Sequence, residues 1–174
     1  MTDWRALLGP VGIALLCAGL LTATYQLTGD RIADNQAARE LALLNDLLPA
    51  GVTLSAQALN WRDDQLVLCD ASLVISRFSA SGYAGPINGL LAWQPARQQA
   101  TGIRVLEHLE TPGIADFLND ISISGWLGNL LRRSPNELAQ LDAVSGATIS
   151  SQALTEAVGL ILTGADPLTQ DCEQ

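Results

Sequence analysis

The sequence predicts an α+β fold in which a single N-terminal transmembrane helix is followed by a mostly antiparallel sheet packed with helices. An uncharged apolar run extends over residues 6–29, short stretches rich in Val, Ile and Leu occupy the middle, and an apolar segment with a helical period lies near the end. Helices at both ends of a run of strands are typical of proteins in which helices pack on an antiparallel sheet.

The apolar run from Ala6 to Gly29 is long enough to cross a lipid bilayer. As a helix with a rise of 1.5 Å per residue it would extend for about 36 Å, and the hydrocarbon core is roughly 30 Å thick. Trp4 and Tyr25 lie near its two ends, where interfacial aromatic residues are common. We therefore predict that residues 1–29 form a transmembrane anchor.

A cleaved signal peptide is the main alternative for this segment, with Thr22-Ala23-Thr24 as a poor cleavage site. A lipoprotein anchor is disfavoured because Cys17 follows Leu16, where a small residue would be expected. Asp3 and Arg5 cancel, so charge marks the orientation only weakly, and the acidic remainder of the chain favours translocation. We expect a single-pass protein of the bacterial inner membrane whose main domain is periplasmic.

The net charge of −9 argues against nucleic acid as a partner. The basic residues are nine Arg, which stand against eighteen Asp and Glu and form no basic patch along the sequence. Affinity for phosphate backbones depends on clustered cations, which this composition does not supply. We assign no metal-binding residues either.

Residues 30–49 have the pattern of an amphipathic juxtamembrane stalk helix that a proline ends. Ile32 and Leu41 belong to its apolar face and Arg39 to its polar face. We expect the soluble domain to follow at residues 50–174.

Five short extended stretches come next, separated by turn residues such as Asp63-Asp64 and Gly85-Pro86. They predict an antiparallel meander, and we expect helical or irregular pieces from Ile114 to Leu131. The stretches are Val52–Leu59, Gln65–Cys69, Leu73–Ser79, Pro86–Trp93 and Gly102–His108.

The segment Ser145-Gly146-Ala147-Thr148-Ile149-Ser150 precedes an apolar helical pattern at residues 151–162. The first turn of a helix has N–H groups without intrahelical partners and a partial positive charge, so an anion near Thr148 would meet hydrogen-bond donors. The small residues Gly146 and Ala147 would let it come close. A plain helix cap is the alternative, because Ser and Thr are common N-caps.

This segment resembles the flavinylation motif of the FMN-binding domain in the G subunit of Rnf-type electron transport complexes, which reads Ser-Gly-Ala-Thr, any residue, then Ser or Thr. The C subunit of the sodium-translocating NADH:quinone reductase carries a related domain. The resemblance implies that a flavin transferase joins Thr148 to the FMN phosphate as a phosphoester. It also implies that Ser145, Gly146 and Ala147 shape the loop around the phosphate. Ser150 would cap the following helix, with phosphate binding as a secondary role.

The segment Thr111-Pro112-Gly113 predicts a type II turn, because proline presets φ at the second position and glycine accepts positive φ at the third. The family has His, one residue and Glu-Thr-Pro-Gly at this place, and there the loop lines the isoalloxazine ring. The resemblance implies flavin contacts for Glu110, Thr111 and Gly113. A mere chain reversal is the alternative, and the lone histidine, His108, more often makes a structural hydrogen bond than acts as a base.

Upstream, Gly82-Tyr83-Ala84-Gly85-Pro86-Ile87 matches the family's Gly-Tyr-x-Gly-x-Ile. Tyr83 could cover a flavin face, and a buried tyrosine at a hairpin corner is the alternative. The chain departs from the family at Ile114-Ala115-Asp116-Phe117, where the usual Leu-Gly-Asp-Lys would supply a lysine, and in the short stretch between Trp126 and Asp142. These departures bear on the tuning of the flavin and on docking to partner subunits.

The resemblance implies a membrane-anchored electron carrier with covalent FMN in an Rnf-type complex, which moves electrons between low-potential donors and NAD and couples this to ion translocation. Such a chain carries electrons rather than acting as an enzyme by itself. Its partners would be the other subunits, the membrane and, during maturation, the flavin transferase. One alternative is a non-flavinated assembly or regulatory module of such a complex, and another is a secreted flavoprotein cleaved near Tyr25.

Cys69 and Cys172 would face an oxidising compartment in this topology, whereas Cys17 belongs to the predicted anchor. Two cysteines far apart in sequence do not establish a bridge, so the sequence leaves a disulfide between them open.

Overall fold

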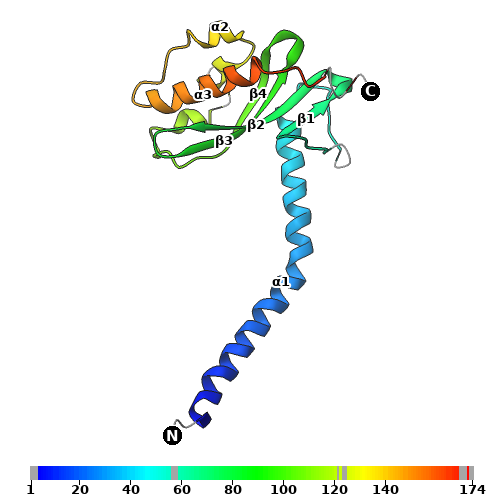
Figure 1. Cartoon of the computed structure of the whole chain (residues 1–174), viewed down its shortest axis with the longest axis vertical. Coiled ribbons are helices and arrows are strands. Elements are labelled where there is room, and N and C mark those ends of the chain that lie inside the picture. Colours follow the sequence, from blue (N-terminus) through cyan, green and yellow to red (C-terminus); the bar gives the residue numbers. More distant parts are fainter. Residues whose placement is uncertain (1–3, 56–58, 121, 123–124, 169–171, 173–174) are drawn as a thin grey trace. The chain divides into compact units, whose positions relative to one another are not determined.

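The computed structural model describes residues 4–55, 59–120, 122, 125–168 and 172. The chain divides into two compact units, Met1–Ala42 and Leu43–Gln174. One helix, α1 (Trp4–Leu47), begins in the first unit and ends in the second (Figure 1). The predicted helix through the apolar run and the stalk is therefore confirmed.

The segment Gly9–Gly29 of α1 is 21 residues long and apolar enough to cross a membrane by length and composition. Its large apolar side chains are exposed within the chain. Thr22 Oγ1 donates to Ala18 O at 2.8 Å and Thr28 Oγ1 donates to Thr24 O at 2.7 Å. These bonds satisfy the hydroxyl groups inside the helix, as an apolar surrounding requires.

The second unit is built on one four-stranded sheet in the order β1-β2-β3-β4, all antiparallel, which confirms the predicted meander. Between the last two strands a short 3-10 turn, Pro95–Arg97, is followed by Gln98 at φ 50°. This reversal starts β4 three residues before the predicted Gly102. The strands are β1 (Gln65–Leu68), β2 (Leu73–Ser81), β3 (Pro86–Gln94) and β4 (Gln99–Glu107).

The predicted strand at Val52–Leu59 is wrong for the described part of that range, 52–55 and 59, which lies in no strand. Residues 56–58 lie outside the described residues. The side chain of Asn45 takes the place of a strand partner: Leu54 N–H donates to Asn45 Oδ1 at 2.6 Å, and Asn45 Nδ2 donates to Leu54 O at 3.3 Å. Because both backbone groups of Leu54 are satisfied locally, the segment does not need the sheet.

One face of the sheet carries the main hydrophobic core, because alternate residues of a strand point to the same side. Val74 and Leu91 pack there with Leu154 and Val158 of α3 (Thr148–Leu162), and all four side chains are fully buried. Truncating one such leucine to alanine typically costs about 2–5 kcal/mol of stability. The packing of α3 on this face fixes where its N-terminus lies.

The last turn of α1 packs against the sheet through β4. A Cβ atom on Gly102 would lie 2.4 Å from Leu47 O, so this close approach requires glycine. Leu44 and Leu47 are buried at this contact, and Asp46 forms an ion pair with Arg104. Helix α3 thus covers one face of the sheet, and the last turn of α1 packs against β4.

Short helical pieces join β4 to α3, as predicted for the region after Ile114. They are the 3-10 helices Asp116–Leu118 and Leu127–Leu130 and the single turn α2 (Pro135–Leu138), which lies with α3 on one side of the sheet (Figure 1). Hydrogen bonds from the Ser134 backbone and side chain hold the pKa of the Glu137 carboxyl below its usual value and cap α2.

A disulfide joins Cys69 to Cys172, with the two Cα atoms 5.6 Å apart, while Cys17 is free. The bridge links the end of β1 to the C-terminal segment across 103 residues. A closed loop of this size restricts the unfolded chain strongly, which corresponds to about 4–5 kcal/mol in the chain-entropy account.

We expect alkylation of the denatured, non-reduced full chain to label one thiol, that of Cys17, because the other two cysteines are bonded. Reduction before alkylation is the control and should raise the label to three per chain. Intact-mass measurement counts the labels, and three labels without reduction would contradict the bridge.

Candidate functional site

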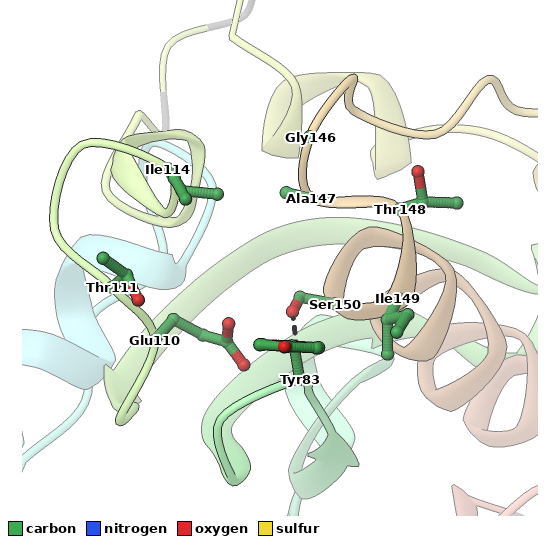
Figure 2. Close-up of a pocket in the computed structure, with 9 residues that line it drawn as sticks. All are labelled: Tyr83, Glu110, Thr111, Ile114, Gly146, Ala147, Thr148, Ile149 and Ser150. Carbon is green, nitrogen blue, oxygen red and sulfur yellow. Dashed lines mark hydrogen bonds between the residues drawn. The ribbon is translucent and has the colours of Figure 1, made fainter.

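A cleft of about 410 Å³ lies where three segments meet: the β2–β3 turn, the loop after β4 and the start of α3 (Figure 2). Sites for small organic ligands commonly enclose roughly 300–1,000 Å³. The residues lining the cleft are Tyr83, Glu110, Thr111, Ile114, Gly146, Ala147, Thr148, Ile149 and Ser150.

The start of α3 carries no side-chain cap. Its N-cap residue is Ala147, which has no hydrogen-bonding side chain, and the helix begins at Thr148. The preceding Gly146 has φ +82°, a conformation that glycine adopts without strain, and Ala147 N–H closes the turn on Val144 O at 3.0 Å. The predicted cap at Ser150 is therefore wrong, because the helix starts before that residue and includes it.

The first-turn N–H groups of Thr148, Ile149 and Ser150 have no carbonyl partner within the helix, as at any helix start. Alignment of the peptide dipoles adds a partial positive charge there. The side chains of Thr148 and Ile149 are exposed beside the cleft. This end of α3 therefore offers donors to an anion without a competing cap.

The hydroxyl groups around the start of α3 differ in their environment. Ser150 and Ser151 are 1% and 0% exposed. Ser150 Oγ accepts a hydrogen bond from Tyr83 N–H at 3.1 Å, whereas the Thr148 side chain is exposed at the cleft. Of the two hydroxyl residues of α3 that line the cleft, Thr148 is therefore the one that an incoming group can reach.

Ser151, which sequence reasoning missed, fastens the loop before α3. Its Oγ donates to Ala147 O at 2.9 Å and accepts from Val144 N–H at 3.1 Å. The second of two adjacent serines at a helix start was a visible signal for such a bond. The motif loop is therefore held on the helix by a side chain outside the motif.

The predicted type II turn is confirmed in the loop after β4. Ile114 N–H donates to Thr111 O at 3.2 Å, and Gly113 in the third position has φ +88°. Gly113 N–H also donates to Asp116 Oδ1 at 3.1 Å. The turn points Thr111 and Ile114 toward the cleft, across from the start of α3 (Figure 2).

Glu110 is only 8% exposed, although it carries a carboxylate. Its Oε1 accepts a hydrogen bond from Ala84 N–H at 3.0 Å. A Cβ atom on Gly82 would lie 2.3 Å from the same oxygen, so glycine at that position makes room for the carboxylate. Glu110 thus connects its own loop to the β2–β3 turn.

Tyr83 is 77% exposed, so the alternative of a buried tyrosine at the hairpin corner is wrong. In Figure 2 its ring lies between Glu110 and Ile149, on the side of the cleft opposite Gly146 and Ala147. An exposed aromatic ring beside a cleft is a suitable surface for a planar ligand.

Most of the predicted site residues meet at this cleft, while Ser145 and Gly113 do not line it. Sequence reasoning missed Ile114 and Ile149, which supply exposed apolar surface. His108 also lies away from the lining, and its buried Nδ1 has no hydrogen-bond partner among the described residues. Within the described part of the chain no cluster of His, Cys, Asp or Glu could hold a metal ion.

Comparison with known proteins shows the family to which this chain belongs. A family model described as the FMN-binding domain matches residues 82–163, and one described as the RnfG N-terminal region matches residues 11–47. The G subunit of the ion-translocating oxidoreductase complex of Stutzerimonas stutzeri is 31% identical over 174 residues, which cover 85% of this chain and 75% of the relative. The chain belongs to the family of these G subunits.

A second relative agrees with this assignment. The protein of the same name from Aliivibrio fischeri strain ES114 is 29% identical over 173 residues, covering 83% of this chain and 81% of the relative. Among solved structures, the crystal structure of Shewanella oneidensis NqrC matches with a TM-score of 0.41 and 26% identity, covering 60% of this chain and 56% of that chain. The cleft and both motif loops lie within the matched FMN-binding domain.

The matched RnfG N-terminal region, residues 11–47, includes most of the α1 segment that is long and apolar enough to cross a membrane.

We expect Gly146→Ala to lower the free energy of unfolding by about 1–2 kcal/mol, because an L-residue is strained at positive φ. Gly159→Ala in the last turn of α3 is the matched control, since a Cβ atom at either glycine meets nothing within 4 Å. Alanine at position 159 should stabilise the protein by roughly 0.5–1 kcal/mol. Urea midpoints of the detergent-solubilised full chain measure both changes, and equal shifts of the same sign would contradict the loop geometry.

Proposed function

We propose that this protein is the flavin-carrying electron-transfer subunit of its complex and that FMN is bound covalently as a phosphoester of Thr148. The observation that carries the proposal is the position of Thr148: an exposed side chain on the first residue of an uncapped helix, facing a cleft inside a matched FMN-binding domain. A phosphate group there would meet free N–H donors and the positive end of the helix dipole.

The residues around the cleft fit the two parts of FMN. The small residues Gly146 and Ala147 leave space for a phosphate beside Thr148. Tyr83 and Ile149 offer aromatic and apolar surface to a planar ring system. FMN exchanges one or two electrons when bound, while the protein supplies its retention, orientation and electrostatic surroundings.

A polar contact to a ring edge would come from Thr111 in the loop after β4, and Ile114 adds apolar surface beside it. Gly113 fixes the turn that presents both residues. Ser145 lies outside the cleft lining, and its proposed role is to shape the loop around the phosphate. Among the described residues that line the cleft none is basic, so the helix-start N–H groups are the donors that we assign to the phosphate.

Formation of the ester requires an activated flavin nucleotide and a flavin transferase. The Thr148 oxygen forms a bond to phosphorus and gives its proton to a base of the transferase, while the bond from phosphorus to a nucleotide leaving group breaks. The reaction happens once, during maturation, so Thr148 acts as an attachment point and takes no part in turnover. Because the linkage is through the phosphate, the isoalloxazine ring is chemically unaltered.

The proposed topology has a transmembrane anchor at residues 1–29, a stalk at 30–49 and a periplasmic FMN-binding domain at 50–174, in the bacterial inner membrane. The disulfide between Cys69 and Cys172 supports it, because stable disulfides form in oxidising compartments. A permanent ester is useful on that side of the membrane, where a dissociated cofactor would diffuse away. The partners are the remaining subunits of the complex, between which this subunit carries electrons.

A second candidate is a non-flavinated, membrane-anchored assembly or regulatory module of the same complex. It is favoured by the short connection from Trp126 to Asp142 and by a cleft whose described lining residues include no basic one. The intact mass of membrane-extracted protein made together with an active flavin transferase distinguishes the two candidates. An unmodified mass would favour the module.

We expect Thr148→Val to abolish covalent flavin while leaving folding and membrane insertion intact, because the substitution removes only the hydroxyl group at an exposed site. The measurement is yellow fluorescence of the protein band in a denaturing gel, after co-expression with the transferase.

Thr163→Val is the matched control, since Thr163 is an exposed threonine at the other end of α3 and its hydroxyl bonds only to backbone oxygens of the same helix. This variant should keep its fluorescence. A fluorescent Thr148→Val band would rule out Thr148 as the attachment residue.

A further inference from the structure

The β2–β3 turn, residues 82–85, forms one wall of the cleft and is held from two sides. Its consecutive N–H groups, those of Tyr83 and Ala84, donate to side chains of two other segments. Tyr83 N–H binds Ser150 Oγ at 3.1 Å, and Ala84 N–H binds Glu110 Oε1 at 3.0 Å. One acceptor comes from the first turn of α3 and the other from the loop after β4.

Both acceptors are buried, although they carry polar groups. Ser150 is 1% exposed and Glu110 is 8% exposed. A buried hydroxyl or carboxylate is costly unless it is hydrogen-bonded, so removing either acceptor leaves a backbone N–H group of the turn unsatisfied. The motif segments that contain Ser150 and Glu110 would suggest that both side chains contact a ligand directly. In the structure, however, the side-chain oxygens of both residues accept hydrogen bonds from backbone N–H groups of the turn.

The turn also has little freedom to move away from these acceptors. Gly82 N–H donates to Gly85 O at 3.0 Å, which closes the hairpin. A Cβ atom at Gly82 would lie 2.3 Å from Glu110 Oε1 and 2.8 Å from Ile87 Cδ1, so the turn is packed tightly on both. The backbone of Tyr83 is therefore fixed while its ring remains 77% exposed.

We propose that Ser150 and Glu110 are positioning residues that hold the Tyr83 ring against the face of the bound flavin. This inference rests on the proposed function of the cleft. Ser150 lies two residues after Thr148 on the same helical turn, so the element that carries the phosphate ester also fixes the aromatic wall. The first turn of α3 thereby links the attachment point to the backbone of Tyr83, and Figure 2 shows both residues beside the cleft.

The test uses flavin fluorescence. A tyrosine ring in contact with an excited flavin quenches the flavin emission by transferring an electron to the flavin, and the electron then returns, so there is no net reaction. Emission and lifetime are measured on the full chain carrying covalent flavin and are normalised to flavin absorbance. We expect Tyr83→Leu to raise the native emission several-fold, toward the value of the denatured protein.

Ser150→Ala and Glu110→Ala should each raise the emission part of the way, and neither should add to the effect of Tyr83→Leu in a double variant. Ser150→Thr and Glu110→Gln keep an acceptor oxygen and should restore the quenching. Ser81→Ala is the matched control, since Ser81 is an exposed serine at the end of β2, and it should leave the emission unchanged.

A second measurement needs no flavin. Amide hydrogen exchange of the unmodified chain should become at least tenfold faster at Tyr83 in Ser150→Ala and at Ala84 in Glu110→Ala, because each N–H group loses its acceptor. Unchanged exchange would overturn the role of the two acceptors. Unchanged emission in Tyr83→Leu would overturn the role of the ring, and absence of covalent flavin in the wild-type chain would overturn the proposed function separately.

Discussion

The packing of α3 across the sheet is the interaction on which the rest of the site depends. Leu154, Val158 and Leu162 lie one turn apart on one stripe of the helix and are fully buried against the strands. With that stripe fixed by apolar burial, the N-terminus of α3 has a single place beside the β2–β3 turn. The uncapped N–H groups at that end are therefore a property of the fold and need no movement to face the cleft.

The same packing leaves some hydroxyl groups at the start of α3 buried and others exposed. Ser150 and Ser151 are directed into the protein, where one holds the β2–β3 turn and the other holds the loop before the helix. Thr148, at the first helical position, remains exposed. The segment thus leaves the Thr148 side chain exposed at the cleft and uses Ser150 and Ser151 in structural hydrogen bonds.

Regular patterns let the sequence predict much of the fold. Strong β-formers between turn residues located the strands after Gln65, and the Pro-Gly pair predicted the type II turn at Thr111. The prediction failed where one side chain decided the local structure, as at Leu54, whose backbone groups bind Asn45, and at Ser150, which binds the distant Tyr83. The bond between Ser150 and Tyr83, like the disulfide, joins positions far apart in sequence, and no local pattern encodes it. Resemblance found the motif loops, but only the folded chain brings them to one cleft.

Localisation of the flavin within the native chain tests the central claim most directly. Protein purified from membranes that contain the flavin transferase is digested, and tandem mass spectrometry of the peptide spanning residues 145–151 assigns the modified residue. The account predicts a flavin phosphate on Thr148, with Ser145, Ser150 and Ser151 unmodified. A flavin phosphate on one of those serines, or an unmodified peptide from a preparation whose transferase is active, would contradict it.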